Sequence, residues 1–232
     1  MLSFRDLKDT STEAWFLNDL GWMFYYKGEV GRAIEQYNQT LQFNIANESF
    51  KSYYKAYPLF CLGLAYYKLD SRAYAVKIGD CFATSKGLRE SKKYRFPDDD
   101  LLIAKIDMNI ARLHLNEGRT KEALSHLKSS LEYYAKYKDY IENLTPRRRA
   151  MELENIANAH FIYGKYYLDD DSIQGAEHEF GLALSASDSI ATKAKFYNNM
   201  AYIHHKRGEN EKAADKFVLA AETDRSLKDR TG

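Results

Sequence analysis

The sequence contains few residues of the kinds that cross-link or interrupt a chain. Cys61 and Cys81 are the only cysteines among 232 residues, and they fit neither a CxxC motif nor a metal-ligand spacing. We therefore expect two buried thiols in a reducing compartment rather than a disulfide. Three prolines and twelve glycines are few for an all-β protein, and no long alternation of polar and apolar residues occurs. Helix is the expected secondary structure.

Long apolar runs and an excess of one charge are also missing. No window is apolar enough over a sufficient length to span a membrane, and the first twenty residues contain no stretch suited to a signal peptide. We therefore expect a cytoplasmic protein with no membrane partner. The formal net charge of +1 argues against a surface that follows nucleic acid along its whole length. Direct nucleic-acid binding is not expected.

Motifs of catalysis are not found either. The six histidines are scattered without an HExxH spacing, and neither a phosphate-binding glycine-rich loop nor a GxSxG turn occurs. His114, His160 and His204 fall where packing residues recur in a helical pattern, so packing explains them better than metal ligation. We expect no enzyme activity, no cofactor and no metal.

What the chain does contain is a recurring pair of helical patterns separated by a turn. The pattern is clearest in residues 193–227, where Gly208 lies in the turn. Its first helix has recurring large and small residues, and its second has an aromatic residue between two alanines. These residues are Tyr197, Met200, Ala201 and His204, then Ala213, Phe217 and Ala220. Such spacing predicts two antiparallel helices in close contact.

Four earlier segments carry the same arrangement with different fidelity. Their equivalent first positions lie near residues 14, 56, 104 and 157, and that of the last copy near 194. The small residue of the first helix is Gly21, Gly63, Ala111 and Gly164 in turn. The pattern resembles the tetratricopeptide repeat (TPR), a unit of 34 residues with an aromatic residue, a Leu-Gly pair and an Ala-Phe-Ala series at fixed places.

The resemblance implies an all-α fold, a right-handed superhelical TPR solenoid of about five helix pairs. It covers nearly the whole chain, so we expect a single array over residues 1–232. A solenoid usually ends in a capping helix, and only KDRTG follows Leu227. From this we expect either an outer face that pairs with another chain or a longer natural protein.

Several local features are also predicted. The capping-box spacing of Thr10 and Glu13 predicts that the first helix starts near Ser11 or Thr12. In the second copy Gly79 stands at the aromatic position and Phe82 at a small one, which predicts altered packing near Gly79.

Three further expectations concern the middle of the chain. Residues 84–100 are expected to form a loop or a fraying helix end, with Asp98, Asp99 and Asp100 capping the next helix. The second helix of the third copy is expected to continue through LEYYAKYKDYIE. Thr145-Pro146 is expected to start another helix.

The family also implies where a ligand would bind, because fixed positions of each first helix point into the concave groove. The predicted groove is aromatic in its N-terminal copies, and Asn-rich and basic in its C-terminal copies. The candidate peptide-binding residues are Trp15, Asn18, Trp22, Tyr25, Tyr57, Phe60, Lys105, Asn109, Arg112, Asn158, Phe161, Lys165, Lys195, Asn198, Tyr202 and His205. An Asn side chain both donates and accepts, so it can hold the backbone of an extended peptide, while Lys and Arg bind its carboxylates.

The groove does not reproduce the carboxylate clamp of chaperone-binding TPR domains, because Asn18 and Trp22 stand where that pattern has Lys and Asn. In style, the long Tyr-rich helices are similar to the peptide-sensing TPR regulators of Gram-positive bacteria. The basic runs at residues 92–95 and 147–149 are interpreted as solvated faces paired with nearby carboxylates, not as a nucleic-acid patch.

Three functions stay open, in this order of preference. The first is a non-catalytic scaffold that binds a peptide or protein segment, of which a peptide-responsive regulator is one form. The second is an assembly module that forms a homodimer through its C-terminal end. The third, a nucleic-acid-binding regulator, has the balanced charge against it.

Overall fold

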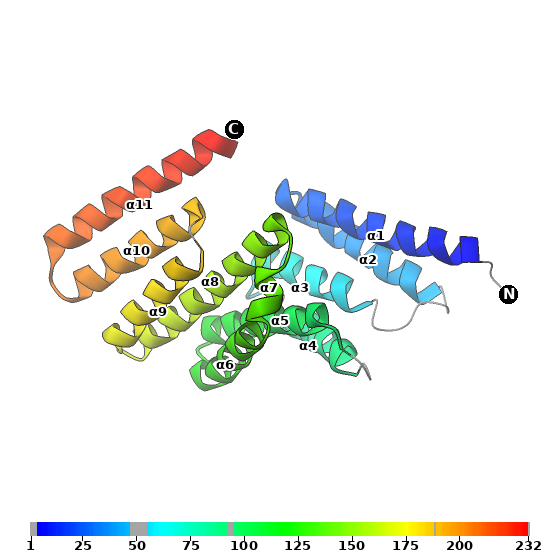
Figure 1. Ribbon diagram of the computed structural model, residues 1–232, viewed down its shortest axis with the longest axis horizontal. Coiled ribbons are helices and arrows are strands. Elements are labelled where there is room, and N and C mark those ends of the chain that lie inside the picture. The colour runs from blue at the N-terminus through cyan, green and yellow to red at the C-terminus, as the bar shows by residue number, and fades with distance from the viewer. Residues whose placement is uncertain (1–3, 47–54, 92–94, 188, 232) are drawn as a thin grey trace. The chain divides into compact units, whose positions relative to one another are not determined.

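The computed structural model describes residues 4–46, 55–91, 95–187 and 189–231 (Figure 1). Within these ranges there are eleven helices and no strand. The chain divides into two compact units, Met1–Ile106 and Asp107–Gly232, which are described separately below. In the described part of the chain, no helix is both long and apolar enough to cross a membrane.

Unit 1 consists of two helical hairpins and the start of a further helix. The helices are α1 (Phe4–Tyr26), α2 (Val30–Ala46), α3 (Ala56–Asp70), α4 (Ala75–Glu90) and the first half of α5 (Pro97–Asn116). Helix α1 packs on α2, α2 on α3, and α3 on α4. The expected start near Ser11 or Thr12 is wrong, since α1 begins at Phe4 and is continuous through Thr10. No Gly or Pro interrupts that stretch, so the Ser and Thr residues that suggested a cap lie inside the helix.

Unit 2 contains the second half of α5 and the helices α6 (Thr120–Lys136), α7 (Lys138–Glu142), α8 (Pro146–Asp169), α9 (Ile173–Ala186), α10 (Ile190–Lys206) and α11 (Asn210–Thr231). Helix α6 packs on α8, α8 on α9, α9 on α10, and α10 on α11. Figure 1 shows α8 beside α9 and α10 beside α11 as hairpins. Alternating helices that each contact their chain neighbours are the arrangement of a helical repeat.

Small residues let the two helices of a hairpin approach closely. A Cβ built on Gly21 would overlap the ring of Tyr37, and one built on Gly164 would overlap the ring of Phe180. Both rings are fully buried. The motif predicted closely packed helices, and the close approach is the reason that glycine is needed at these two places.

The second hairpin differs from the predicted register. A Cβ on Gly63 would lie 2.6 Å from the ring of Phe82, whereas nothing lies within 4 Å of the position on Gly79. Phe82 is therefore the aromatic residue of this hairpin, and buried Ile78 takes the place expected for Ala75. The cause is a longer turn: helix α3 ends at Asp70 and α4 begins only at Ala75. Packing near Gly79 is open, as expected.

Two further expectations in the middle of the chain need correction. Residues 84–90 are helical, because α4 continues to Glu90. The predicted continuous helix after Ala123 is interrupted, since Tyr137 has φ −107° and ψ 22°, between the end of α6 and the start of α7. The acidic residues in the first turn of α5 act as expected, because Asp99 Oδ2 accepts the backbone N–H of Phe96 at 3.0 Å.

The helix that follows starts as predicted. Pro146 is the first residue of α8 and Thr145 precedes it as N-cap, although the Thr145 side chain makes no capping hydrogen bond. In three of the turns a glycine adopts positive φ: Gly28 at 81°, Gly118 at 74° and Gly208 at 74°. These values lie in the left-handed region, which other residues rarely adopt.

Candidate functional site

The described residues contain no group of three or more side chains suited to a metal ion. Instead, three histidines pair with one carboxylate each. The Nδ1 atoms of His126, His160 and His204 lie 2.8, 2.7 and 2.7 Å from Asp107, Glu179 and Glu209. Asp107 also accepts the hydroxyl of Ser129 at 2.7 Å, which explains why an acid occupies an apolar place in the repeat. These histidines connect elements of the fold.

In unit 1 the predicted groove residues form an aromatic cluster. Trp22 is its centre: its Nε1–H donates to Tyr57 Oη at 3.1 Å, and its ring stacks on Tyr26 with centroids 5.3 Å apart. Tyr25 meets Trp22 edge-on at 5.3 Å. Trp15 is 57% exposed and lies 6.5 Å from Tyr57. The cluster presents large apolar surface together with hydroxyl groups, a composition common in binding sites.

Not all predicted residues of unit 1 are accessible. Asn18 and Phe60 are buried, at 2% and 5% exposure. Asn18 lies against Cys61, a thiol whose pKa burial raises, and Phe60 packs on the buried ring of Phe82. Both cysteines of the chain are buried free thiols, as predicted. For Asn18 and Phe60 the expectation of groove-facing side chains is wrong: they lie in the packed interior under the aromatic cluster.

Unit 2 brings several predicted polar residues together around Lys195. Its Nζ donates to Asn158 Oδ1 at 2.6 Å and lies 3.8 Å from Glu154 Oε1. The same atom lies 5.9 Å from the ring centre of Phe161, which is itself buried and forms a floor. Residues from α8 and α10, 37 positions apart, are thus joined at one place.

The electrostatics of this cluster are dominated by cations. Burial lowers the pKa of Lys195, and the nearby charges of Arg112 and Lys165 lower it further, while Glu154 raises it. Arg112 Nη2 donates to Asn109 Oδ1 at 2.7 Å, so the buried Asn109 orients this guanidinium. The charges of Arg112 and Lys165 are thus close enough to act on Lys195, and Glu154 is the carboxylate that pairs with it.

Glu154 is the residue that the sequence did not single out as part of the site. Its Oε2 accepts hydroxyl groups from Ser187, Ser189 and Thr192 at 2.8, 2.7 and 2.6 Å. Burial alone would raise the pKa of Glu154, but these hydrogen bonds lower it below its usual value. Glu154 thereby fastens the start of α10 to α8 and holds Lys195 in place. The signal was the SxSxxT pattern of hydroxyl residues that follows α9.

The remaining predicted residues continue along α10. Asn198, Tyr202 and His205 are exposed, and His205 Nδ1 lies 3.3 Å from Asn210 Oδ1. Lys105 belongs to unit 1 and is half-buried. Asn109 and Phe161 are buried, at 3% and 5% exposure, so for them too the expectation of groove-facing side chains is wrong. In unit 2 the accessible predicted residues are Arg112, Asn158, Lys165 and those on α10.

The basic runs are less prominent than these clusters. Residues 92–94 lie outside the described residues, and Arg95 pairs with Asp100 at 3.0 Å. Residues 147–149 are exposed on the first turn of α8, where Arg149 donates to the Glu142 carbonyl at 3.4 Å. Of the two glutamates expected to pair with this run, Glu152 and Glu154, the latter binds the hydroxyl groups and Lys195 instead.

Comparison with known proteins finds similarity in structure and not in sequence. No protein-family model and no curated protein matches this chain. Among solved structures, BtubC (BKLC) from P. vanneervenii is 12% identical with a TM-score of 0.66, over 97% of this chain and 89% of that one. The Rap conjugation gene regulator of plasmid pLS20, solved with the Phr peptide, is 16% identical with a TM-score of 0.69. That match covers 98% of this chain but 57% of the Rap regulator.

A kinesin light chain of Podosopora anserina with TPR-like repeats is 12% identical with a TM-score of 0.59, over 93% of this chain and 96% of that one. At such identities the likeness is one of fold. The paired helices and their close contacts define a helical-repeat protein. More particularly, its fold is that of TPR proteins, as the sequence pattern predicted.

Proposed function

We propose that this protein is a non-catalytic scaffold that binds an extended, acidic peptide or protein segment. The observation that carries the proposal is the contact of Lys195 with Asn158 in unit 2, where the charges of Arg112 and Lys165 also act on Lys195. Cations attract the carboxylates of a ligand, and an amide that both donates and accepts can pair with its backbone. Exposed Asn198 and Tyr202 extend the surface along α10.

Glu154 already pairs with Lys195, and Asn109 with Arg112, so binding should cost less side-chain freedom than it would for unpaired cations. In unit 1 the cluster around Trp22 is a second candidate surface, suited to apolar side chains of a ligand.

A selection from a displayed random peptide library tests the proposal. We expect enrichment of peptides that contain Asp or Glu, with binding that weakens as salt is added. Asn158→Ala and Arg112→Ala should each weaken the best peptide about ten-fold or more, which corresponds to about 1.4 kcal/mol. Lys128→Ala, an exposed change on α6, is the matched control and should leave affinity unchanged. Peptides without acidic residues, or equal affinity for all variants, would contradict the proposal.

A regulatory role is the finer part of the proposal. The similar Rap regulator was solved with a peptide, and a ligand that binds one conformation better shifts the population toward it. Small-angle X-ray scattering with and without the selected peptide would measure this shift as a change in radius of gyration. An unchanged profile at saturation would leave a scaffold without a switch.

A second candidate function is assembly, supported by apolar residues exposed on α11. Phe217, Val218 and Leu219 are 49%, 56% and 37% exposed. Large apolar side chains left exposed on one helix are typical of protein contacts, and we assign these to contact with a second copy of the chain. Analytical ultracentrifugation of wild type and Val218→Glu tests this: a dimer that the substitution dissociates supports it, and a wild-type monomer contradicts it.

A further inference from the structure

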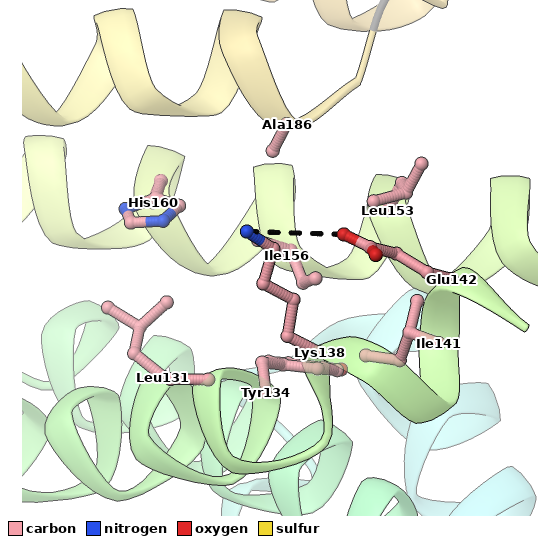
Figure 2. Close-up of a pocket in the computed structure, with 10 residues that line it drawn as sticks. Leu131, Tyr134, Lys138, Ile141, Glu142, Leu153, Ile156, His160 and Ala186 are labelled. Carbon is pink, nitrogen blue, oxygen red and sulfur yellow. Dashed lines mark ion pairs between the residues drawn. The ribbon is translucent and has the colours of Figure 1, made fainter.

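Unit 2 contains a pocket of about 370 Å³ that none of the predicted groove residues lines. It lies between α6, α7 and α8, with Ala186 at the end of α9 (Figure 2). The pocket exists because the chain bends at Tyr137, which directs α7 away from the axis of α6. Its volume is at the small end of the range of ligand pockets, about 300–1,000 Å³.

The walls are mainly apolar. They are formed by Leu131, Ile141, Leu153, Ile156, Ala186 and the ring of Tyr134. At the rim, Lys138 Nζ lies 4.0 Å from Glu142 Oε1, and both side chains are largely exposed (Figure 2). Because the rim carries one charge of each sign, it gives no net attraction to an ion. Apolar walls and a balanced rim favour an uncharged ligand.

One polar group gives the pocket chemical direction. His160 lines it, and the Nδ1 of this ring is 2.7 Å from Glu179 Oε2. A carboxylate can only accept, so the neutral imidazole has its proton on Nδ1 and a lone pair on Nε2. Within the described part of the chain, no residue donates to that Nε2. A ligand that binds beside His160 should therefore supply a donor.

Tyr134 has a different role. Its ring forms part of the wall, but its hydroxyl is buried and the charge of Glu152 helps to raise its pKa, after burial itself. That hydroxyl has no hydrogen-bond partner among the described residues. Tyr134→Phe removes it and keeps the wall, so this variant shows whether the hydroxyl or His160 receives the ligand.

We propose that this pocket binds a small uncharged molecule with an apolar body and one hydrogen-bond donor, such as a substituted phenol or an indole. The body occupies the space between α6, α7 and α8, and the O–H or N–H donates to His160 Nε2. This site is separate from the peptide surface around Lys195.

Two probes that differ by one hydroxyl test the proposal on the whole chain. Titration of 4-propylphenol and propylbenzene, followed by ligand-observed NMR, gives an affinity for each. We expect both to bind and the phenol to bind about five-fold more tightly, the effect of one hydrogen bond of about 1 kcal/mol. Failure of both probes to bind, or equal affinities, would overturn the proposal.

Variants locate the binding. Leu153→Trp fills the pocket and should abolish binding of both probes, while Met151→Trp, an exposed change two residues earlier on α8, should not. His160→Phe keeps a ring in the wall but removes the acceptor Nε2, so the preference for the phenol should disappear. Tyr134→Phe should retain it. A preference that persists in His160→Phe, or binding that persists in Leu153→Trp with unchanged helicity, would contradict the assignment.

Discussion

The two units use the same helical hairpin but different side chains to hold it. Unit 1 contains both tryptophans and both cysteines and no histidine, whereas unit 2 contains all six histidines. Where α1 of the first hairpin meets α3 of the second, the contacts are aromatic, with Trp22 donating to Tyr57. Between α5 and α6, and between α8 and α9, a histidine meets a carboxylate. The same backbone architecture thus accommodates two kinds of contact between helices. We call the Trp22–Tyr57 contact of unit 1 the aromatic seam and the histidine–carboxylate contacts of unit 2 the polar seam.

The polar seam depends on more specific pairing of residues than the aromatic seam does. Asp107 pairs with His126, and His160 pairs with Glu179, in both cases nineteen residues apart. The acid lies on the first helix in one hairpin and on the second helix in the other. A buried charge is costly without its partner, so such a pair tolerates exchange but not loss of one member.

The largest effect is expected where both units rely on the same contact. Gly21→Ala and Gly164→Ala would each place a methyl group inside an aromatic ring. Overpacking of this kind lowers the free energy of unfolding by up to about 3 kcal/mol. Gly31→Ala in α2 and Gly181→Ala in α9 meet no atom within 4 Å and serve as controls. Urea unfolding followed by circular dichroism measures the difference. If alanine were tolerated at Gly21 but not at Gly164, the helices of these two hairpins would differ in how tightly they pack.

The next effect concerns the polar seam alone. Asp107→Ala leaves His126 and Ser129 without their acceptor, and we expect a loss of about 2 kcal/mol in the free energy of unfolding. The exchange Asp107→His with His126→Glu copies the order found in α8 and α9. It should recover part of the stability that either single change loses, which a double-mutant cycle measures. Additive losses would show that the pair is not interchangeable.

How far the sequence predicts this molecule depends on which contact is considered. The contact of Gly164 with Phe180 follows from the repeat pattern, because helical spacing fixes which residues face each other. The contact of Gly63 with Phe82 does not, because the pattern does not encode the length of the turn before α4. Likewise, no Gly or Pro marks the bend at Tyr137, so neither α7 nor the pocket beside it could be foreseen.

The candidate site shows the same division. The motif assigned Asn158 and Lys195 to equivalent positions of adjacent copies, and these two side chains do meet. It also assigned Asn18 and Phe60 to the groove, where burial excludes them. Register gives the direction of a side chain, but which neighbours cover it depends on packing that a single sequence does not contain.

Acid should produce a smaller difference between the two units: unit 2 should lose stability as the pH falls, and unit 1 should not. Burial lowers the pKa of His114 below its usual 6.5, so the unfolded chain binds a proton first and stability falls as pH decreases below 6.5. The lowered pKa of Glu154 adds a loss below 4.5, as this carboxylate is protonated in the unfolded chain before the folded one. Melting followed by circular dichroism from pH 7 to 5 should show the first loss, and His114→Phe should remove it. Tryptophan emission at 20 °C, which reports only on unit 1, should not change over that range.

The smallest effect is expected in the second hairpin of unit 1. Gly79 lies within α4 with open space around it, since Phe82 and not this position faces Gly63. Alanine costs less backbone entropy than glycine in a helix, so Gly79→Ala should stabilise unit 1 by about 0.5–1 kcal/mol. Urea unfolding followed by tryptophan emission measures it, with Gly63→Ala as the opposite case because its methyl group would meet Phe82 at 2.6 Å. Destabilisation by Gly79→Ala would mean that the hairpin has the register of the repeat motif and that the longer turn does not shift it.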